Sequence, residues 1–260
     1  MTSTKEYSQV FSPLAESGDK ASIYEQPSVQ AALGQTFRPG GLELTERALG
    51  FYALPAGARL LDVGCGTGET ARYLHDRGYW ASGVDRSASL LGIGRRRHPS
   101  LPFIRADGCC LPLPSGAFEA VFAECSLSTF DPVDFALAEC ERVLVSGNHL
   151  ILSDLYARNP VGLAALRALS LTGCLGNLLL QADLVGQLAS SGFDIIIWED
   201  HSEALCDLAC RLAAVPEELA RLQGGPATVP VEAWDLQLAI AKARPGYFLL
   251  IAQKRGSSFR

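Results

Sequence analysis

The chain has 260 residues, 48% of them hydrophobic, and a formal net charge of −6 at pH 7. This length and apolar content suit one α/β domain with a cap or insertion better than two independent domains. The acidic balance argues against broad nucleic-acid binding, which requires cations to neutralise phosphates. The one basic run, Arg95–Arg97, is interpreted as a solvated helix end.

Two features bear on location. The first residues, MTSTKEYSQVF, contain no apolar core of a secretory signal. The most apolar stretch, Val161–Leu180, is interrupted by Arg167 and Asn177, which indicates a buried or capping helix rather than a membrane span. We therefore expect a cytoplasmic protein without a membrane segment. The eight cysteines form no C-x-x-C pair, and reduced thiols acting as small core residues are the default interpretation.

Residues 1–57 show no alternating strand pattern, and we expect a helical N-terminal cap there. Two helices are predicted, over Pro27–Leu33 and Leu42–Leu54. The turn between them, Arg38-Pro39-Gly40-Gly41, has exposed amides and a cation that could close over an anionic ligand group. The same turn could equally be a simple link between two helices.

From Arg59 onwards, short apolar strands alternate with helical stretches, which predicts a doubly wound, mostly parallel α/β sheet over residues 58–260. Seven strands are expected, at Arg59–Val63, Trp80–Asp85, Pro102–Ala106, Ala117–Ala123, His149–Asp154, Asp194–Glu199 and Tyr247–Gln253. Helices are expected at Glu69–Arg77, Ala88–Arg97, Pro132–Val143 and Ala182–Ser190. Insertions at about 156–181 and 201–245 are expected to form a mostly helical lid over the carboxyl ends of the strands, where open α/β sheets bind ligands.

The first strand leads into a glycine-rich turn in the segment RLLDVGCGTGET. Asp62 precedes three glycines at alternate positions, Gly64, Gly66 and Gly68, with Cys65 inside the turn. A turn of this kind at a helix N-terminus lets backbone approach a polar ligand closely. The dinucleotide pattern G-x-G-x-x-G would require a glycine where Glu69 stands, which disfavours a nicotinamide enzyme.

Acidic residues end the next three strands. Asp85 follows the turn by about twenty residues, and a carboxylate there can accept both hydroxyls of a ribose. Asp107 ends the third strand in FIRADGCCLPLPSGAF, and Glu124 ends the fourth. A later segment, ECERVLVSGNHLILSD, runs into the fifth strand.

Together these motifs resemble class I S-adenosylmethionine-dependent methyltransferases, over roughly residues 36–200. The likeness is to the ubiquinone/menaquinone and arsenite types, with a methyltransferase type 11 domain. Their pattern E-x-x-R-V-L-x-x-G-G-x-L-x-x-x-D is kept except at Asn148, a residue that tolerates a left-handed turn. The resemblance implies a Rossmann-like fold, S-adenosylmethionine as cofactor, and methyl transfer to a small-molecule acceptor by in-line displacement.

The resemblance also implies roles for individual residues. The glycine turn would receive the amino-acid and ribose portion of the cofactor, and Asp85 would accept from the ribose hydroxyls. Asp62 could hold the turn or the cofactor ammonium, or could only cap local backbone. Asp107 would accept from the adenine amino group. The remaining cofactor contacts would come from Arg38 and Gly40 at the carboxylate, Arg86 beside the adenine, the Gly108 or Cys109 backbone at a ring nitrogen, and Glu124 at the sulfonium.

No strong acid–base constellation indicates how the acceptor is activated, and no metal site is expected. The candidate catalytic residues are Glu124, Asp154, Tyr156 and Cys174. The segment Gly173-Cys174-Leu175-Gly176-Asn177 resembles arsenite methyltransferases, in which a cysteine binds the substrate, and Cys206 and Cys210 share a helix face. Thiol-dependent methylation of a metalloid is therefore one alternative, and a non-catalytic cofactor-binding protein is another. The acceptor, its reacting atom and the oligomeric state are not indicated by the sequence.

Overall fold

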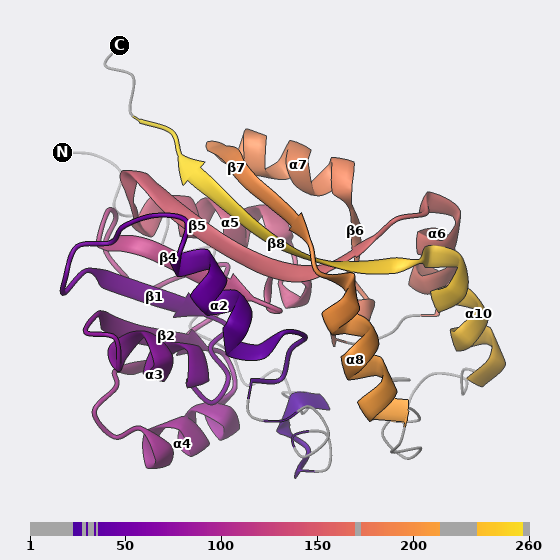
Figure 1. The fold of residues 1–260 in the computed structure, drawn as a ribbon, viewed down its shortest axis with the longest axis horizontal. Helices are drawn as coiled ribbons and strands as arrows, with labels where there is room; N and C mark the ends of the chain where they lie inside the picture. Colours follow the sequence, from indigo (N-terminus) through magenta and orange to yellow (C-terminus); the bar gives the residue numbers. More distant parts are fainter. Residues whose placement is uncertain are drawn as a thin grey trace, which may run out of the picture.

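The computed structural model describes residues 23–27, 30, 34, 36–169, 173–213 and 233–256. Its centre is an eight-stranded sheet with strand order β3-β2-β1-β4-β5-β8-β7, and β6 pairs with β5 off this path (Figure 1). The strands are β1 (Arg59–Val63), β2 (Trp80–Asp85), β3 (Phe103–Arg105), β4 (Phe118–Glu124), β5 (Leu144–Ala157), β6 (Leu179–Leu180), β7 (Phe193–Asp200) and β8 (Pro245–Lys254).

The N-terminal half of the sheet is parallel. Strands β3, β2, β1, β4 and β5 pair in parallel, whereas β8 runs antiparallel to both β5 and β7. Strand β1 buries almost every residue, as expected for a strand covered on both faces. The carboxyl ends of β1 to β5 therefore lie at one edge of the sheet, and this edge presents the polar residues that follow each strand.

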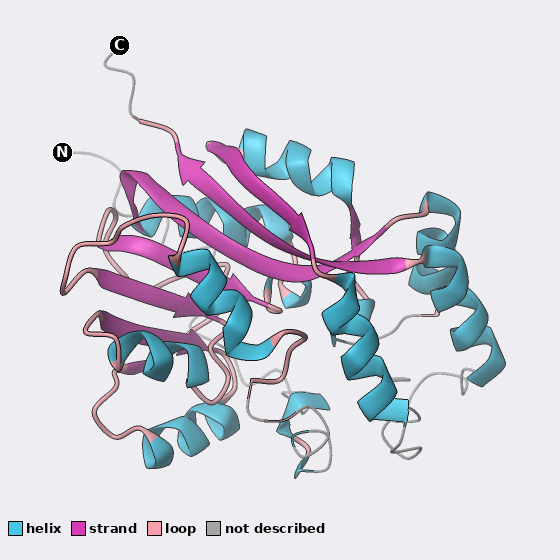
Figure 2. Ribbon diagram, in the orientation of Figure 1, coloured by secondary structure: helices cyan, strands magenta, loops and turns pink. Residues whose placement is uncertain are grey.

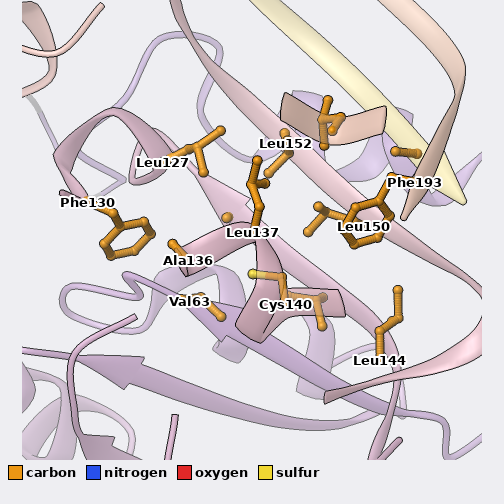
Figure 3. Packing of buried hydrophobic residues seen from close by; sticks show 14 of the residues in the cluster. Val63, Leu127, Phe130, Ala136, Leu137, Cys140, Leu144, Leu150, Leu152 and Phe193 are labelled. Carbon is orange, nitrogen blue, oxygen red and sulfur yellow. The ribbon is translucent and has the colours of Figure 1, made fainter. Parts of the chain in front are cut away.

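Helices cover both faces of the sheet (Figure 2). On one face, α2 (Gly41–Leu49) and α3 (Glu69–His75) bury Ala48, Ala71 and Leu74 against β1, β4 and β5. On the other face, α5 (Val133–Val143) and α7 (Gln181–Ser190) cover the sheet. Figure 3 shows α5 inserting Ala136, Leu137 and Cys140 among the side chains of the strands beneath it. Helix α4 (Ala88–Arg97) packs against β2 and β3.

A third hydrophobic cluster lies beyond the carboxyl ends of the parallel strands. There α6 (Pro160–Ala168) packs against α10 (Ala233–Ala243), and both pack on the ends of β5 and β8 (Figure 1). The α6–α10 contact is a close backbone approach, because a Cβ atom on Gly162 would overlap the Ala243 backbone. Helix α8 (Ser202–Ala213) follows β7. Among the described residues, no helix combines the length and apolar content needed to cross a bilayer.

The doubly wound, mostly parallel sheet predicted from the sequence is confirmed, with differences in its elements. The sheet has eight strands rather than seven, because Leu179–Leu180 adds a short parallel pairing to β5. The fifth strand is much longer than expected, since β5 stays paired with β8 from His149 to Ala157. Helix α2 ends at Leu49 instead of continuing to Leu54. The helix expected over Pro27–Leu33 falls mostly outside the described residues.

Candidate active site

The glycine turn is held in place by the two neighbouring strands. The amides of Gly64 and Cys65 both donate to the Val84 carbonyl, at 2.8 and 3.0 Å. Gly64 has a φ of 78°, and a Cβ atom there would overlap the Ser126 side chain, so only glycine fits. Gly66 is different, because a Cβ atom there would meet only the Phe37 ring, at 3.7 Å, which is ordinary van der Waals contact. The turn therefore packs tightly at Gly64 and less tightly at Gly66.

Asp85 fastens this turn to the end of β2. One carboxylate oxygen accepts from the Gly66 amide at 2.8 Å, and the other accepts from the Ser87 amide at 2.8 Å. Burial raises the pKa of Asp85. Each oxygen keeps a second lone pair for a hydroxyl donor. The short helix η2 (Ile23–Glu25) reaches the same place, since the Ser87 hydroxyl donates to Glu25 at 2.7 Å.

Arg38 and Glu124 form a buried ion pair across the site. The Arg38 Nη2 atom lies 2.8 Å from Glu124 Oε2, and the two side chains are 5% and 1% exposed. Two threonines complete the network: Arg38 donates to Thr70 and Thr45, and both hydroxyls donate to Glu124. This arrangement ties α2 and α3 to the end of β4. It also occupies the Glu124 carboxylate, which leaves it poorly placed to act as a base.

Three buried polar atoms around the glycine turn have no hydrogen-bond partner: Arg38 Nε, Asp62 Oδ2 and Thr67 Oγ1. Buried polar groups are nearly always paired, so each such atom calls for an explanation, such as a ligand. Asp62 is 3% exposed, and burial followed by repulsion from Glu124 raises its pKa to about 8. These atoms offer a cationic donor, a carboxylate and a hydroxyl on one wall of the site.

The third strand leads to a second polar turn. Asp107 accepts from the Cys109 amide at 2.9 Å, which fixes the carboxylate. Gly108 permits close packing, because a Cβ atom there would lie 2.6 Å from the Phe130 ring. Arg86 is exposed beside Asp85, and its carbonyl accepts from Arg105. The structure thus brings Asp62, Asp85, Asp107 and Glu124 to the same sheet edge.

Two candidate catalytic residues are engaged in structural contacts. Asp154 is buried and accepts from the Ser128 amide and hydroxyl and from the Leu155 amide, at 2.7–2.9 Å. Burial raises its pKa to about 6. The Tyr156 hydroxyl donates to Asp200 and accepts from Arg158, and its ring packs edge-on against Trp198. Tyr156 therefore lies with the β7 side chains, away from the glycine turn.

The fourth candidate, Cys174, lies in the 3-10 helix η4 (Gly173–Leu175). Its sulfur is 3.1 Å from the Tyr24 hydroxyl. Its thiol is also close enough to that of Cys125, the residue after β4, for each to shift the pKa of the other. Among the described residues, no group of three or more histidine, cysteine or acidic side chains could hold a metal ion. Cys206 is exposed on α8, and the side chain of Cys210 lies outside the described residues.

Several site residues have no signal in the sequence. Thr45 and Thr70 belong to the site only because both hydrogen-bond to the Arg38–Glu124 ion pair. Arg38 and Glu124 are 86 residues apart in the sequence. Tyr24 precedes every recognised motif. Cys125 directly follows Glu124, and its φ of 55° is unusual for a residue other than glycine. Such a backbone angle cannot be read from composition or periodicity.

Comparison with known proteins shows which families this chain resembles. Residues 61–152 match the family model described as a methyltransferase domain, a segment that runs from β1 through the glycine turn, β2, β3 and β4 into β5. This segment of the chain is therefore similar to a methyltransferase domain. A demethylmenaquinone methyltransferase from Renibacterium salmoninarum is 34% identical over 52% of this chain and 55% of its own length. A malonyl-[acyl-carrier protein] O-methyltransferase from Enterobacter lignolyticus is 34% identical over 38% of this chain and 40% of its own length.

Solved structures match more of the chain than the family model does. The cyclase SpnF is 28% identical over 85% of this chain and 84% of its own, with a TM-score of 0.65. A phosphoethanolamine N-methyltransferase from Haemonchus contortus has a TM-score of 0.69, is 19% identical, and covers 90% of this chain and 57% of its own. At that identity the second match supports the fold alone. The chain spans about half the length, or less, of the curated relatives described above.

Proposed function

We propose that this protein is an S-adenosylmethionine-dependent methyltransferase that acts on a small organic acceptor. The observation that carries the proposal is the set of three unpaired buried polar atoms around the glycine turn. The matched family and the curated methyltransferase relatives support the same activity.

The residues around the turn fit the tail of this cofactor. Its α-carboxylate needs a donor, and Arg38 has an unused buried Nε–H. Its α-ammonium needs an acceptor, and Asp62 has an unused carboxylate oxygen. Burial raises the pKa of Asp62 to about 8. A cation beside this carboxyl would lower its pKa again, because an opposite charge favours the ionised form. The Arg38–Glu124 pair keeps the guanidinium fixed, so that little ordering cost remains on binding.

The nucleoside portion fits the next two strand ends. Asp85 is already oriented by two amide donors and can accept ribose hydroxyls with its remaining lone pairs. Asp107, fixed by the Cys109 amide, would accept from the adenine amino group. Gly40, Cys65 and Arg86 would contribute backbone or flanking contacts only, because the Cys65 thiol is packed against Gly83 and Arg86 is exposed.

Catalysis would rest on alignment and exclusion of water. When bound, the cofactor supplies an activated methyl group on its sulfonium. Glu124 and Asp154 are both saturated by hydrogen bonds, so neither is free to take a proton from the acceptor. The chain's contribution would be to hold donor and acceptor in line, which can lower the barrier by about 7–11 kcal/mol.

The acceptor is inferred to be largely apolar. The third hydrophobic cluster, from α6, α10 and the ends of β5 and β8, continues to Cys125, Cys174 and Leu175 beside the strand ends. The quinone substrate named for the relative from Renibacterium salmoninarum is of this kind. The net charge of −6 favours a small molecule over nucleic acid. We also infer a cytoplasmic location, because the seven cysteines of the described residues are free thiols.

A second candidate function is a cyclisation performed in the same pocket. It is favoured by the match to the cyclase SpnF, which covers 85% of this chain, more than the curated methyltransferase relatives described above cover. Such a reaction would leave the methyl group of a bound cofactor in place.

A turnover assay distinguishes the two functions. The purified chain would be incubated with S-adenosylmethionine and a panel of apolar phenols, quinols and carboxylic acids, and S-adenosylhomocysteine would be quantified by mass spectrometry. A methyltransferase forms this product in an acceptor-dependent manner, and Asp85→Ala reduces the rate. Tight cofactor binding without product formation for any acceptor would overturn the methyltransferase and favour the cyclase.

A further inference from the structure

Two cysteines from distant segments meet at the end of β4. Cys125 directly follows Glu124, and Cys174 lies in η4, which packs against the 3-10 helix η3 (Leu127–Thr129) that follows Cys125. The two thiols are close enough for each to shift the pKa of the other. A third side chain joins them, since the Tyr24 hydroxyl lies 3.1 Å from the Cys174 sulfur.

This pair differs from the cysteines of the core. Cys140 is 1% exposed and extends from α5 into the core, as a small hydrophobic residue would (Figure 3). Cys125 and Cys174 are both partly exposed and lie at the edge of the third hydrophobic cluster. Cys125 also holds a left-handed backbone angle, φ 55°, which is costly for a residue with a side chain. Its packing alone does not account for that conformation.

The surroundings give the two thiols different reactivity. The hydrogen bond from Cys125, aided by the one with Tyr24, lowers the pKa of Cys174. The same hydrogen bond, together with burial, raises the pKa of Cys125. The thiolate is the nucleophile in disulfide exchange, and the Tyr24 hydroxyl, 3.1 Å from the Cys174 sulfur, is placed to donate to a thiolate there. Cys174 is therefore assigned as the attacking sulfur and Cys125 as the resolving one.

We propose that Cys125 and Cys174 are a redox pair that a small-molecule disulfide, such as oxidised glutathione, converts to an internal disulfide. The Cys174 thiolate attacks the glutathione disulfide, forms a mixed disulfide and releases one glutathione thiolate. The Cys125 sulfur then attacks Cys174, and the second glutathione leaves. The two protons from the cysteines end on the two released thiols, so the pair is oxidised by two electrons and the glutathione disulfide is reduced by two.

The bond would tie η4 to the strand end that faces the acceptor. This consequence rests on the proposed function, because it assumes that the acceptor approaches beside Glu124. The residues assigned to the cofactor, Arg38, Asp62 and Asp85, lie outside the cross-link. Oxidation is therefore expected to lower turnover and leave cofactor affinity nearly unchanged.

Peptide mapping tests the pair without reference to activity. The full chain is incubated with oxidised glutathione, quenched with acid, alkylated and digested. We expect one disulfide-linked peptide joining Cys125 to Cys174, and Cys125→Ser should instead accumulate glutathione on Cys174. Cys110→Ser is the matched control at an exposed thiol and should behave as the wild type. Absence of the linked peptide, or glutathione mainly on Cys110 or Cys206 in Cys125→Ser, would overturn the proposal.

The ratio of oxidised to reduced turnover tests the consequence. In the wild type this ratio should fall about tenfold or more and recover with dithiothreitol, while S-adenosylhomocysteine affinity changes by less than about twofold. In Cys174→Ser the oxidised and reduced protein should turn over at nearly the same rate, so that the ratio stays close to one, whatever the basal rate. Equal inactivation of Cys174→Ser would overturn the regulatory role. If no acceptor is methylated, the linked peptide still decides the redox pair, so the two proposals fail separately.

Discussion

At the scale of single residues, the site combines carboxylates in opposite situations. Glu124 is neutralised by Arg38 and two threonine hydroxyls. Asp62 lies nearby with an unpaired oxygen, and its pKa is raised to about 8. The folded protein therefore keeps a destabilising carboxyl in its interior, and the proposed cofactor would relieve it. This contrast is the local signature of a binding site.

The raised pKa of Asp62 has a consequence for stability against pH. The folded state binds the Asp62 proton more tightly than the unfolded state, so the free energy of unfolding should fall as pH rises from about 4 to about 8. Asp62→Asn removes this dependence and should stabilise the ligand-free protein at pH 8 by about 1–3 kcal/mol, with little change at pH 4. Urea denaturation at the two pH values measures it, with the exposed Asp194→Asn as control. Equal effects at both pH values would contradict the assignment.

Glu124 offers a second test, which compares its buried ion pair with an exposed one. The exposed pair, Arg59–Glu119, serves as the control. Glu124→Gln leaves the Arg38 charge buried without its counterion and should lower the free energy of unfolding by about 3 kcal/mol. Glu119→Gln should cost less than about 1 kcal/mol, since its partner is half exposed. Urea denaturation compares them directly. Similar losses for both variants would show that Glu124 is not the centre of a buried network.

At the scale of elements, the ligand-facing end of the sheet is closed by helices that touch each other closely. Gly162 of α6 lies against the Ala243 backbone of α10, where a methyl group has no room. Gly162→Ala should therefore lower the free energy of unfolding by about 1–3 kcal/mol. Gly186 of α7 has no atom within 4 Å of such a methyl group, so Gly186→Ala should be neutral or stabilising by up to about 1 kcal/mol. Thermal unfolding of both variants checks the packing, and equal shifts in Tm would argue against it.

Elements with local signals were predictable from the sequence. Strands β1 and β2 and helix α4 have the predicted bounds, because apolar runs and the Ser87 cap mark them. The extent of β5 was not predictable, since its pairing with β8 spans about a hundred residues of chain. Strand β6 has two residues and no periodicity. The Arg38–Glu124 network depends on tertiary approach, and no local pattern encodes it.

At the scale of the molecule, the sheet order β3-β2-β1-β4-β5-β8-β7 explains why these residues converge. Parallel strands bring the ends of β1, β2, β3 and β4 together, and with them Asp62, Asp85, Asp107 and Glu124. Helices α6 and α10, beyond the carboxyl ends of these strands, supply an apolar surface where the acceptor is expected. One sheet edge thus provides a polar wall for the cofactor and an apolar wall for its partner.

The most direct measurement of this account is calorimetric titration of the full chain with S-adenosylhomocysteine. The account predicts binding at one site per chain. It also predicts that Asp85→Ala lowers the affinity by about 1.5–3 kcal/mol, or roughly 10- to 150-fold, because charge-assisted hydrogen bonds are lost. No detectable binding to the wild-type chain, or unchanged affinity in Asp85→Ala, would contradict it.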